Sequence, residues 1–270
     1  MAFGSKRVYT SLVCYSIQSF ERLLSTCILL MYQSILVMAL HISEASPNCT
    51  VTGIHYFCNN IATLTDLPLV LPINVRKVTL MGIYERKPSF SGERFTHHTW
   101  AKVSELSILE FTNVDRIESG FLNGLNELQF LSVSSCTHLG EIDPDTFYST
   151  PNIEELHFNW NRVLDLSMVE AALIGKLSNL RYLYLIAIQG VKQHVVLGEK
   201  FVKALHRKNL TYLDISRVNA IYMEHILVPE VLANIVNLNL SYSSIMFPHG
   251  ITDKAISLIK ITCTFWILLV

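Results

Sequence analysis

The chain has 270 residues, of which 50% are hydrophobic and only 16% charged, and its 21 Lys and Arg residues nearly balance its 22 Asp and Glu residues. A net charge of −1 provides no electrostatic field for binding nucleic acid, and a chain this apolar is not intrinsically disordered. The composition leaves two classes: a membrane protein, or an exported chain whose apolar residues recur at regular intervals.

The N-terminal segment, residues 1–45, has the pattern of a secretory signal. A basic N-terminus precedes the apolar stretch 23–40, and Ser43-Glu44-Ala45 places small residues where a signal peptidase cleaves. We therefore expect a cleaved signal peptide. The apolar stretch is also long enough for an uncleaved signal anchor, and a buried core helix is the remaining alternative.

Two cysteines follow directly after the expected cleavage site. Cys49 and Cys58 enclose eight residues, and in an exported chain such a pair predicts a disulfide that closes an N-terminal cap over residues 46–74. No CxxC motif and no histidine at ligand spacing accompany them, which argues against zinc. Three N-x-S/T sequons, at Asn48, Asn209 and Asn239, favour the same extracellular compartment.

Residues 75–250 contain an internal repeat of about seven units. The frame LxxLxL, with apolar residues at slots one, four and six, recurs with first slots at residues 75, 106, 128, 153, 180, 210 and 235. Four of the six steps between these positions fall within the range of leucine-rich repeats. Leu106-Leu109-Phe111 is the second frame in this series.

The clearest unit, 153–166, has Asn161 at slot nine, where the consensus accepts Asn or Cys. A side chain at this slot points inward and bonds backbone groups left open where the chain leaves the strand. Cys136 occupies the same slot in the preceding unit, which explains this cysteine without a redox role. The other units place Val114, Ile188, Val218 or Ser243 there, so we expect an irregular ladder.

These repeats predict an α/β fold, a leucine-rich-repeat solenoid with a curved parallel sheet on its concave face and an irregular or short-helical convex side. The spacers between strands carry apolar residues and phenylalanines at matching offsets. We expect Phe121, Phe147 and Phe201 to form a stacked core on the convex side.

The C-terminal tail, residues 251–270, ends in ten apolar or uncharged residues after Lys260. A bilayer span needs about 20 such residues. The tail is a buried segment or truncated repeat, the start of an unfinished span, or the edge of an incomplete gene product.

From Cys49 onward the chain resembles the N-terminal part of a Toll-like receptor ectodomain. The resemblance rests on CTVTGIHYFCNN, on LTDLPLVLPINVRKVTLMG, and on repeat units such as IESGFLNGLNELQFLSVS and NLTYLDISRVNAI, and it covers about residues 49–247. It implies a horseshoe that opens with a short cysteine-bounded cap and serves innate immune recognition. Seven repeats without a cysteine-rich C-terminal cap, a complete second span or a TIR signalling domain are typical of a partial receptor or a secreted relative, which could not signal by itself.

Alternation of side chains along a strand predicts the ligand-binding face. If slots four and six point into the core, then slots three, five, seven and eight face the concave surface. This places an aromatic strip with two flanking charges on adjacent strands, formed by Trp160, Tyr182, Tyr184, Tyr212, Asp214 and Arg217. Tyr, Trp and Arg are frequent anchors of protein interfaces, although aromatics on adjacent strands also stabilise a sheet by packing across it. A glycan on Asn239 would lie on the same face.

The sequence contains none of the motifs expected of common enzymes. It lacks G-x-S-x-G, a phosphate-binding loop, H-E-x-x-H and G-x-G-x-x-G. The one pair of neighbouring histidines, His97-His98, lies in a spacer and has no third ligand. We expect no enzymatic activity, no cofactor and no metal site.

The leading hypothesis is an extracellular leucine-rich-repeat recognition module of Toll-like-receptor type that binds a protein, glycan or microbial ligand. A secreted matrix or adhesion protein that binds a protein partner structurally is the first alternative. A membrane-anchored accessory chain is the third class, and it requires an uncleaved N-terminal segment. The expected localisation is secreted or on the extracellular side of a membrane, and receptor-type dimerisation and membrane attachment are left open.

Overall fold

The computed structural model describes residues 47–62, 66–82, 90, 94–190, 194–223, 231 and 235–246. The expected signal peptide, the apolar C-terminal tail and the last residues of the repeat region lie outside this part of the chain. None of the helices within the described residues has the length and hydropathy needed to cross a bilayer.

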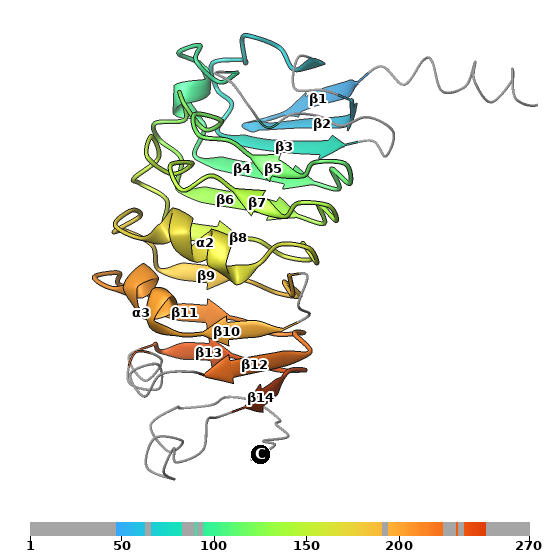
Figure 1. Ribbon diagram of the computed structural model, residues 1–270. Coiled ribbons are helices and arrows are strands. Elements are labelled where there is room, and N and C mark those ends of the chain that lie inside the picture. Colours follow the sequence, from blue (N-terminus) through green and yellow to red (C-terminus); the bar gives the residue numbers. More distant parts are fainter. Residues whose placement is uncertain are drawn as a thin grey trace, which may run out of the picture. The chain divides into compact units, whose positions relative to one another are not determined.

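A nine-stranded main sheet contains one strand from each successive unit of the chain (Figure 1). Its first two strands form an antiparallel hairpin, and every later strand pairs in parallel with the one before it. The strands in spatial order are β1 (Asn48–Thr52), β2 (His55–Ile61), β3 (Lys77–Gly82), β4 (Glu105–Leu109), β6 (Phe130–Ser134), β8 (Glu155–His157), β9 (Tyr182–Tyr184), β11 (Tyr212–Asp214) and β13 (Asn237–Asn239). The predicted leucine-rich-repeat solenoid is confirmed.

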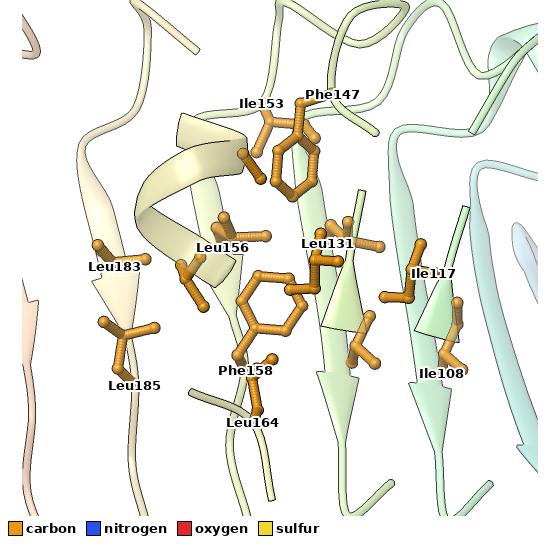
Figure 2. Packing of buried hydrophobic residues seen from close by; sticks show 14 of the residues in the cluster. Ile108, Ile117, Leu131, Phe147, Ile153, Leu156, Phe158, Leu164, Leu183 and Leu185 are labelled. Atoms are coloured by element: carbon orange, nitrogen blue, oxygen red, sulfur yellow. The ribbon is translucent and has the colours of Figure 1, made fainter. Parts of the chain in front are cut away.

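Slots four and six line up across the main sheet. Leu131, Leu156 and Leu183 occupy slot four of three neighbouring strands, pair directly with one another, and are at most 2% exposed. Figure 2 shows them on one side of the sheet, where Phe158, the slot-six residue directly after β8, also lies. Since alternate strand residues point to opposite faces, the apolar slots form a continuous core and the intervening residues form a second face.

The strand pairing corrects the position of one predicted repeat. Leu106 pairs with Leu131 and Ile108 pairs with Val133, so Leu106 occupies slot four, not slot one. The first slot of this unit is Val103, which is fully buried, and slot nine is Phe111 in place of Val114. The first slots are therefore 75, 103, 128, 153, 180, 210 and 235, and the steps between them are 28, 25, 25, 27, 30 and 25 residues. The repeat is more regular than the sequence frame suggested.

Shorter elements lie on the core side of the main sheet. Helix α2 begins after Asp165, whose carboxylate accepts a hydrogen bond from the backbone N–H of Ser167 at 2.9 Å, a typical N-cap. Helices α2 and α3 pack against each other. These elements are η2 (Trp100–Lys102), α2 (Leu166–Leu173), α3 (Glu199–Leu205), the paired strands β5 (Arg116–Ile117) and β7 (Glu141–Ile142), and a parallel sheet of β10 (Val195–Leu197), β12 (Ala220–Met223) and β14 (Ser244–Met246).

The slot-nine side chain of one unit bonds the backbone of the preceding unit, as predicted. Asn161 accepts a hydrogen bond from the N–H of Cys136 at 2.9 Å and donates one to the carbonyl of Val133 at 2.7 Å. The Ser243 hydroxyl accepts a hydrogen bond of 3.0 Å from the N–H of Val218, and Val218 is the slot-nine residue of the preceding unit. Serine therefore replaces asparagine in this role near the C-terminal end of the sheet.

The buried phenylalanines contact different partners from those expected. Phe121, Phe147 and Phe201 are each 1% exposed, but no ring contact among the described residues joins them to one another. Phe121 stacks on Phe90 with ring centroids 4.9 Å apart, and Phe147 contacts Phe158 at 6.4 Å. The three residues are core residues of separate units and do not form a single stack.

The N-terminal cap continues the repeat register. Cys49 and Cys58 form the predicted disulfide, which joins β1 to β2. Cys58 pairs with Leu80 of β3 and thus occupies slot six of a preceding unit. The cap therefore covers the end of the core with a strand that follows the spacing of the repeats.

Candidate functional site

The candidate site is the face of the main sheet opposite the core, which we call the solvent face. It carries the residues at slots three, five and seven of each unit. On β4 and β6 this face includes the serines Ser107, Ser132 and Ser134, and the aromatic ring of Phe130 on β6. Ring side chains then continue on β8, β9 and β11.

Four rings form a continuous row across neighbouring strands, and we call them the aromatic row: Phe130, His157, Tyr184 and Tyr212. The ring centroid of His157 lies 5.0 Å from that of Phe130 and 4.1 Å from that of Tyr184. Tyr184 stacks on Tyr212 with ring centroids 4.8 Å apart. Such cross-strand pairs stabilise a sheet. Phe130 was not among the predicted site residues, although its slot-three position already placed it on this face.

The predicted aromatic residues differ in position and accessibility: the three tyrosines lie on the solvent face, and Trp160 follows β8 at slot eight. Tyr182 is 39% exposed and Trp160 is 41% exposed, so both offer ring surface to a partner. Tyr184 and Tyr212 are half-buried because each packs in the aromatic row. Burial, together with the nearby charge of Glu155, raises the pKa of Tyr184 to about 12, so its phenol remains a hydrogen-bond donor at neutral pH.

Asp214 is not the exposed flanking charge that the sequence predicted. It lies on the solvent face but is only 4% exposed. Its carboxylate accepts hydrogen bonds from the side-chain amide of Asn239 at 2.8 Å and from the N–H of Ser216 at 3.0 Å. These bonds come from the following unit and from its own chain, and they make Asp214 a structural residue of the sheet.

A histidine–carboxylate pair lies in the middle of the aromatic row. The Nε2 of His157 is 2.7 Å from Oε1 of Glu155. Burial lowers the pKa of His157 below its ordinary value, and the hydrogen bond and charge of Glu155, with a smaller effect of Asp214, only partly oppose this. His157 is therefore neutral at pH 7.

We expect acid to destabilise the folded chain in part through His157. Because the pKa of His157 is lower in the folded state, the unfolded state binds a proton more readily as the pH falls. The contribution of neutral His157 to the free energy of unfolding is therefore complete above pH 6.5 and is lost as the pH falls through the folded-state pKa. Urea unfolding measured between pH 5 and pH 8 should show a smaller loss of stability for His157→Gln than for the wild type. Parallel pH profiles for the two proteins would contradict this assignment.

A second row of side chains follows the strands at slot eight. The residues at this slot have positive φ in seven units: Asn60, Glu110, Ser135, Trp160, Ala187, Arg217 and Tyr242, with φ between 57° and 61°. We call them the slot-eight row. In this left-handed conformation their N–H groups still bond the next unit, as Trp160 does to the carbonyl of Ile186 at 2.7 Å and Arg217 to that of Ser241 at 2.9 Å. The sequence frame placed several of these residues on the same face but gave no sign of the shared backbone conformation.

The slot-eight row brings together side chains from units far apart in the sequence. The guanidinium of Arg217 lies 5.6 Å from the ring centroid of Trp160 and 4.8 Å from that of Tyr242. These distances are typical of cation–π interactions. Of the predicted site residues, Trp160 and Arg217 are thus joined here, whereas Tyr184 and Tyr212 belong to the aromatic row.

The predicted glycosylation sites differ in their surroundings. Asn48, on β1, and Asn209, just before β11, are exposed. Asn239 lies half-buried on the solvent face, where its side-chain amide bonds Asp214. A sugar attached there would compete with this hydrogen bond.

The described part of the chain offers little for catalysis. It contains no group of three His, Cys, Asp or Glu side chains that could hold a metal ion. His97 and His98 lie with their ring centroids 4.1 Å apart. Burial raises the pKa of the Cys136 thiol to about 12, which leaves no thiolate to act as nucleophile at neutral pH.

No family model matches the chain, and no curated protein matches its sequence. Among solved structures, the chain is similar to the crystal structure of human 5T4 (Wnt-activated inhibitory factor 1, trophoblast glycoprotein). The two are 20% identical with a TM-score of 0.55, over 77% of this chain and 74% of that one. This is a likeness of fold to a leucine-rich-repeat ectodomain.

Proposed function

We propose that the chain is an extracellular leucine-rich-repeat module that binds a protein partner through the solvent face of its main sheet. The observation that carries this proposal is the exposed ring of Tyr182 on the solvent face, in the same strand as Tyr184 of the aromatic row. Rigid tyrosine and tryptophan rings contribute contact area at little entropic cost, and they dominate the energetics of many interfaces. The rings of the aromatic row pack against one another on the same face, so this part of the surface is ordered before a partner arrives.

The extracellular location is supported by three independent features. The Cys49–Cys58 disulfide requires an oxidising compartment. Sequons at Asn48 and Asn209 lie on exposed residues, and the solved structure that resembles this fold is described as a glycoprotein. A secreted matrix or adhesion protein and the extracellular part of a receptor both fit these features.

The narrower proposal, a Toll-like-receptor type of innate immune recognition, is supported by the sequence resemblance around Cys49–Asn60 and by the repeat style. The structural neighbour is described as Wnt-activated inhibitory factor 1, or trophoblast glycoprotein, and gives this narrower proposal no specific support. A glycan ligand, receptor-type dimerisation and membrane attachment stay predictions. A protein partner is the ligand class that the aromatic solvent face favours.

Substitution of Tyr182 tests the proposed surface. In a binding screen of the purified chain against extracellular protein domains, Tyr182→Ala should weaken the interaction with any partner found by at least about tenfold, which corresponds to about 1.4 kcal/mol. Tyr148→Ala is the matched control, because Tyr148 is 82% exposed but lies in the turn after β7, away from the solvent face. Surface plasmon resonance measures both variants. Equal binding by wild type and Tyr182→Ala, with loss in Tyr148→Ala, would move the interface off this face.

A further inference from the structure

Arg217 is an exposed cation held between two aromatic rings. Trp160 is 41% exposed and Tyr242 is 78% exposed, and the guanidinium between them is also exposed. Within the described residues, no carboxylate forms an ion pair with Arg217, and its side chain donates no hydrogen bond. The donor groups of the guanidinium are therefore available to a molecule outside the chain. We call Trp160, Arg217 and Tyr242 the arginine clamp.

The backbone orients the arginine clamp before binding. All three residues belong to the slot-eight row, so their left-handed conformation directs the side chains along one line. Ala187, the slot-eight residue of the unit between Trp160 and Arg217, contributes only a methyl group and is 3% exposed. This small side chain leaves room for the guanidinium to reach the Trp160 ring over an intervening strand.

We propose that the arginine clamp binds a carboxylate side chain, Asp or Glu, of a protein partner. This inference rests on the proposed function and names the chemistry of the contact. A planar guanidinium forms two parallel hydrogen bonds with a carboxylate, and contact with two ring faces limits the rotamers that binding must otherwise restrict. The flanking rings favour a partner segment in which an apolar residue lies next to the acidic one.

The charge pattern favours a carboxylate over a sulfated polysaccharide. A highly sulfated chain is bound by several cations along its length. In the slot-eight row Arg217 is the one cation among the described residues, and Glu110 lies in the same row. A single bidentate contact is therefore what this row can provide.

A peptide titration tests the arginine clamp without knowledge of the natural partner. The probe is an acetylated and amidated hexapeptide that alternates glutamate and leucine, and its matched control has glutamine in place of glutamate. In ¹H–¹⁵N spectra of the purified full chain, the glutamate peptide should shift the Trp160 indole and Arg217 Nε signals saturably. The glutamine peptide should bind at least tenfold more weakly.

Two variants separate charge from geometry. Arg217→Asn removes the guanidinium with a residue that tolerates positive φ, and it should abolish the shifts. Arg217→Lys keeps the charge but loses the planar fork, and it should weaken binding at least fivefold. Tyr242→Ser removes one ring at a highly exposed position, so the core stays intact, and it should weaken binding of the glutamate peptide. This variant provides the test if Arg217→Asn fails to fold.

The outcomes distinguish this inference from the proposed function. Equal binding of the two peptides, no binding of either, or binding of a heparin-derived oligosaccharide in place of the glutamate peptide would overturn the carboxylate assignment. A protein partner that is lost in Tyr182→Ala but retained in Arg217→Asn would also overturn it, while the proposed function would stand. A shift with the glutamate peptide, in a chain for which Tyr182→Ala has no effect on partner binding, would support the clamp and move the interface toward it.

Discussion

Replacing Gly124 by alanine is expected to lower the free energy of unfolding by about 4 kcal/mol. Gly124 has a φ of +94°, a conformation that costs an L-residue about 1–2 kcal/mol. A Cβ at this position would also lie 2.0 Å from the carbonyl oxygen of Phe95. The obstacle is backbone, so it cannot rotate away, and Phe95 is fully buried against Trp100 and Phe121. The core around Phe95 must therefore shift to admit the methyl group.

Gly175→Ala separates backbone strain from the steric conflict. Gly175 also has positive φ, +71°, but a Cβ there meets nothing within 4 Å. We expect this control to cost about 1 kcal/mol, from strain alone. Urea unfolding followed by circular dichroism measures both variants. Equal losses of stability in the two variants would contradict the close approach of Phe95 to Gly124.

Replacing Asn161 by leucine is expected to lower the free energy of unfolding by about 3 kcal/mol. The side chain is fully buried and bonds the N–H of Cys136 and the carbonyl of Val133. Leucine has a similar size but no polar atoms, so both backbone groups would be left buried and without partners. Each such group costs about 1–3 kcal/mol.

Asn161→Ser is the informative companion variant, because Ser243 already performs this role in another unit. Serine should retain part of the bonding and lose about half as much stability as leucine. Thermal unfolding of the wild type and the two variants measures their order of stability. In a chain of this size the melting temperature should fall about 2–4 °C for each kcal/mol of unfolding free energy lost. If leucine were tolerated as well as serine, the buried hydrogen bonds would not be a main source of stability at slot nine.

The fold could be predicted because the repeat frame reports directly on burial, yet the frame was wrong in one unit. Leu106-Leu109-Phe111 and Val103-Leu106-Ile108 both satisfy the apolar pattern, because apolar residues at 103, 106, 108, 109 and 111 fill the slots of either frame. The choice depends on pairing with Leu131 in the next strand, a contact that one segment read alone does not contain. The regular steps of 25 residues in the corrected register are the signal that could have resolved it.

The sequence could predict which face of the sheet carries the candidate site, but not the burial and contacts of its individual residues. Alternation along the strands placed Tyr182, Tyr184 and Tyr212 correctly on the solvent face. It could not predict the burial of Asp214, because this burial depends on the Asn239 amide 25 residues away. Nor could it predict that Arg217 contacts Trp160 across an intervening unit, since that contact requires the left-handed backbone at slot eight and the small Ala187 between them.

The slot-eight row has a consequence for how such a surface can change over evolutionary time. Its backbone conformation is maintained by hydrogen bonds between main-chain groups of adjacent units, which are independent of the side chain present. Acidic, aromatic, small and cationic residues all occupy it in this one chain. Substitution along this line can therefore alter what the molecule recognises while the leucine framework behind it is inherited unchanged. The residues selected against should be β-branched ones, which tolerate positive φ poorly, and proline, which cannot adopt it and lacks the N–H that bonds the next unit.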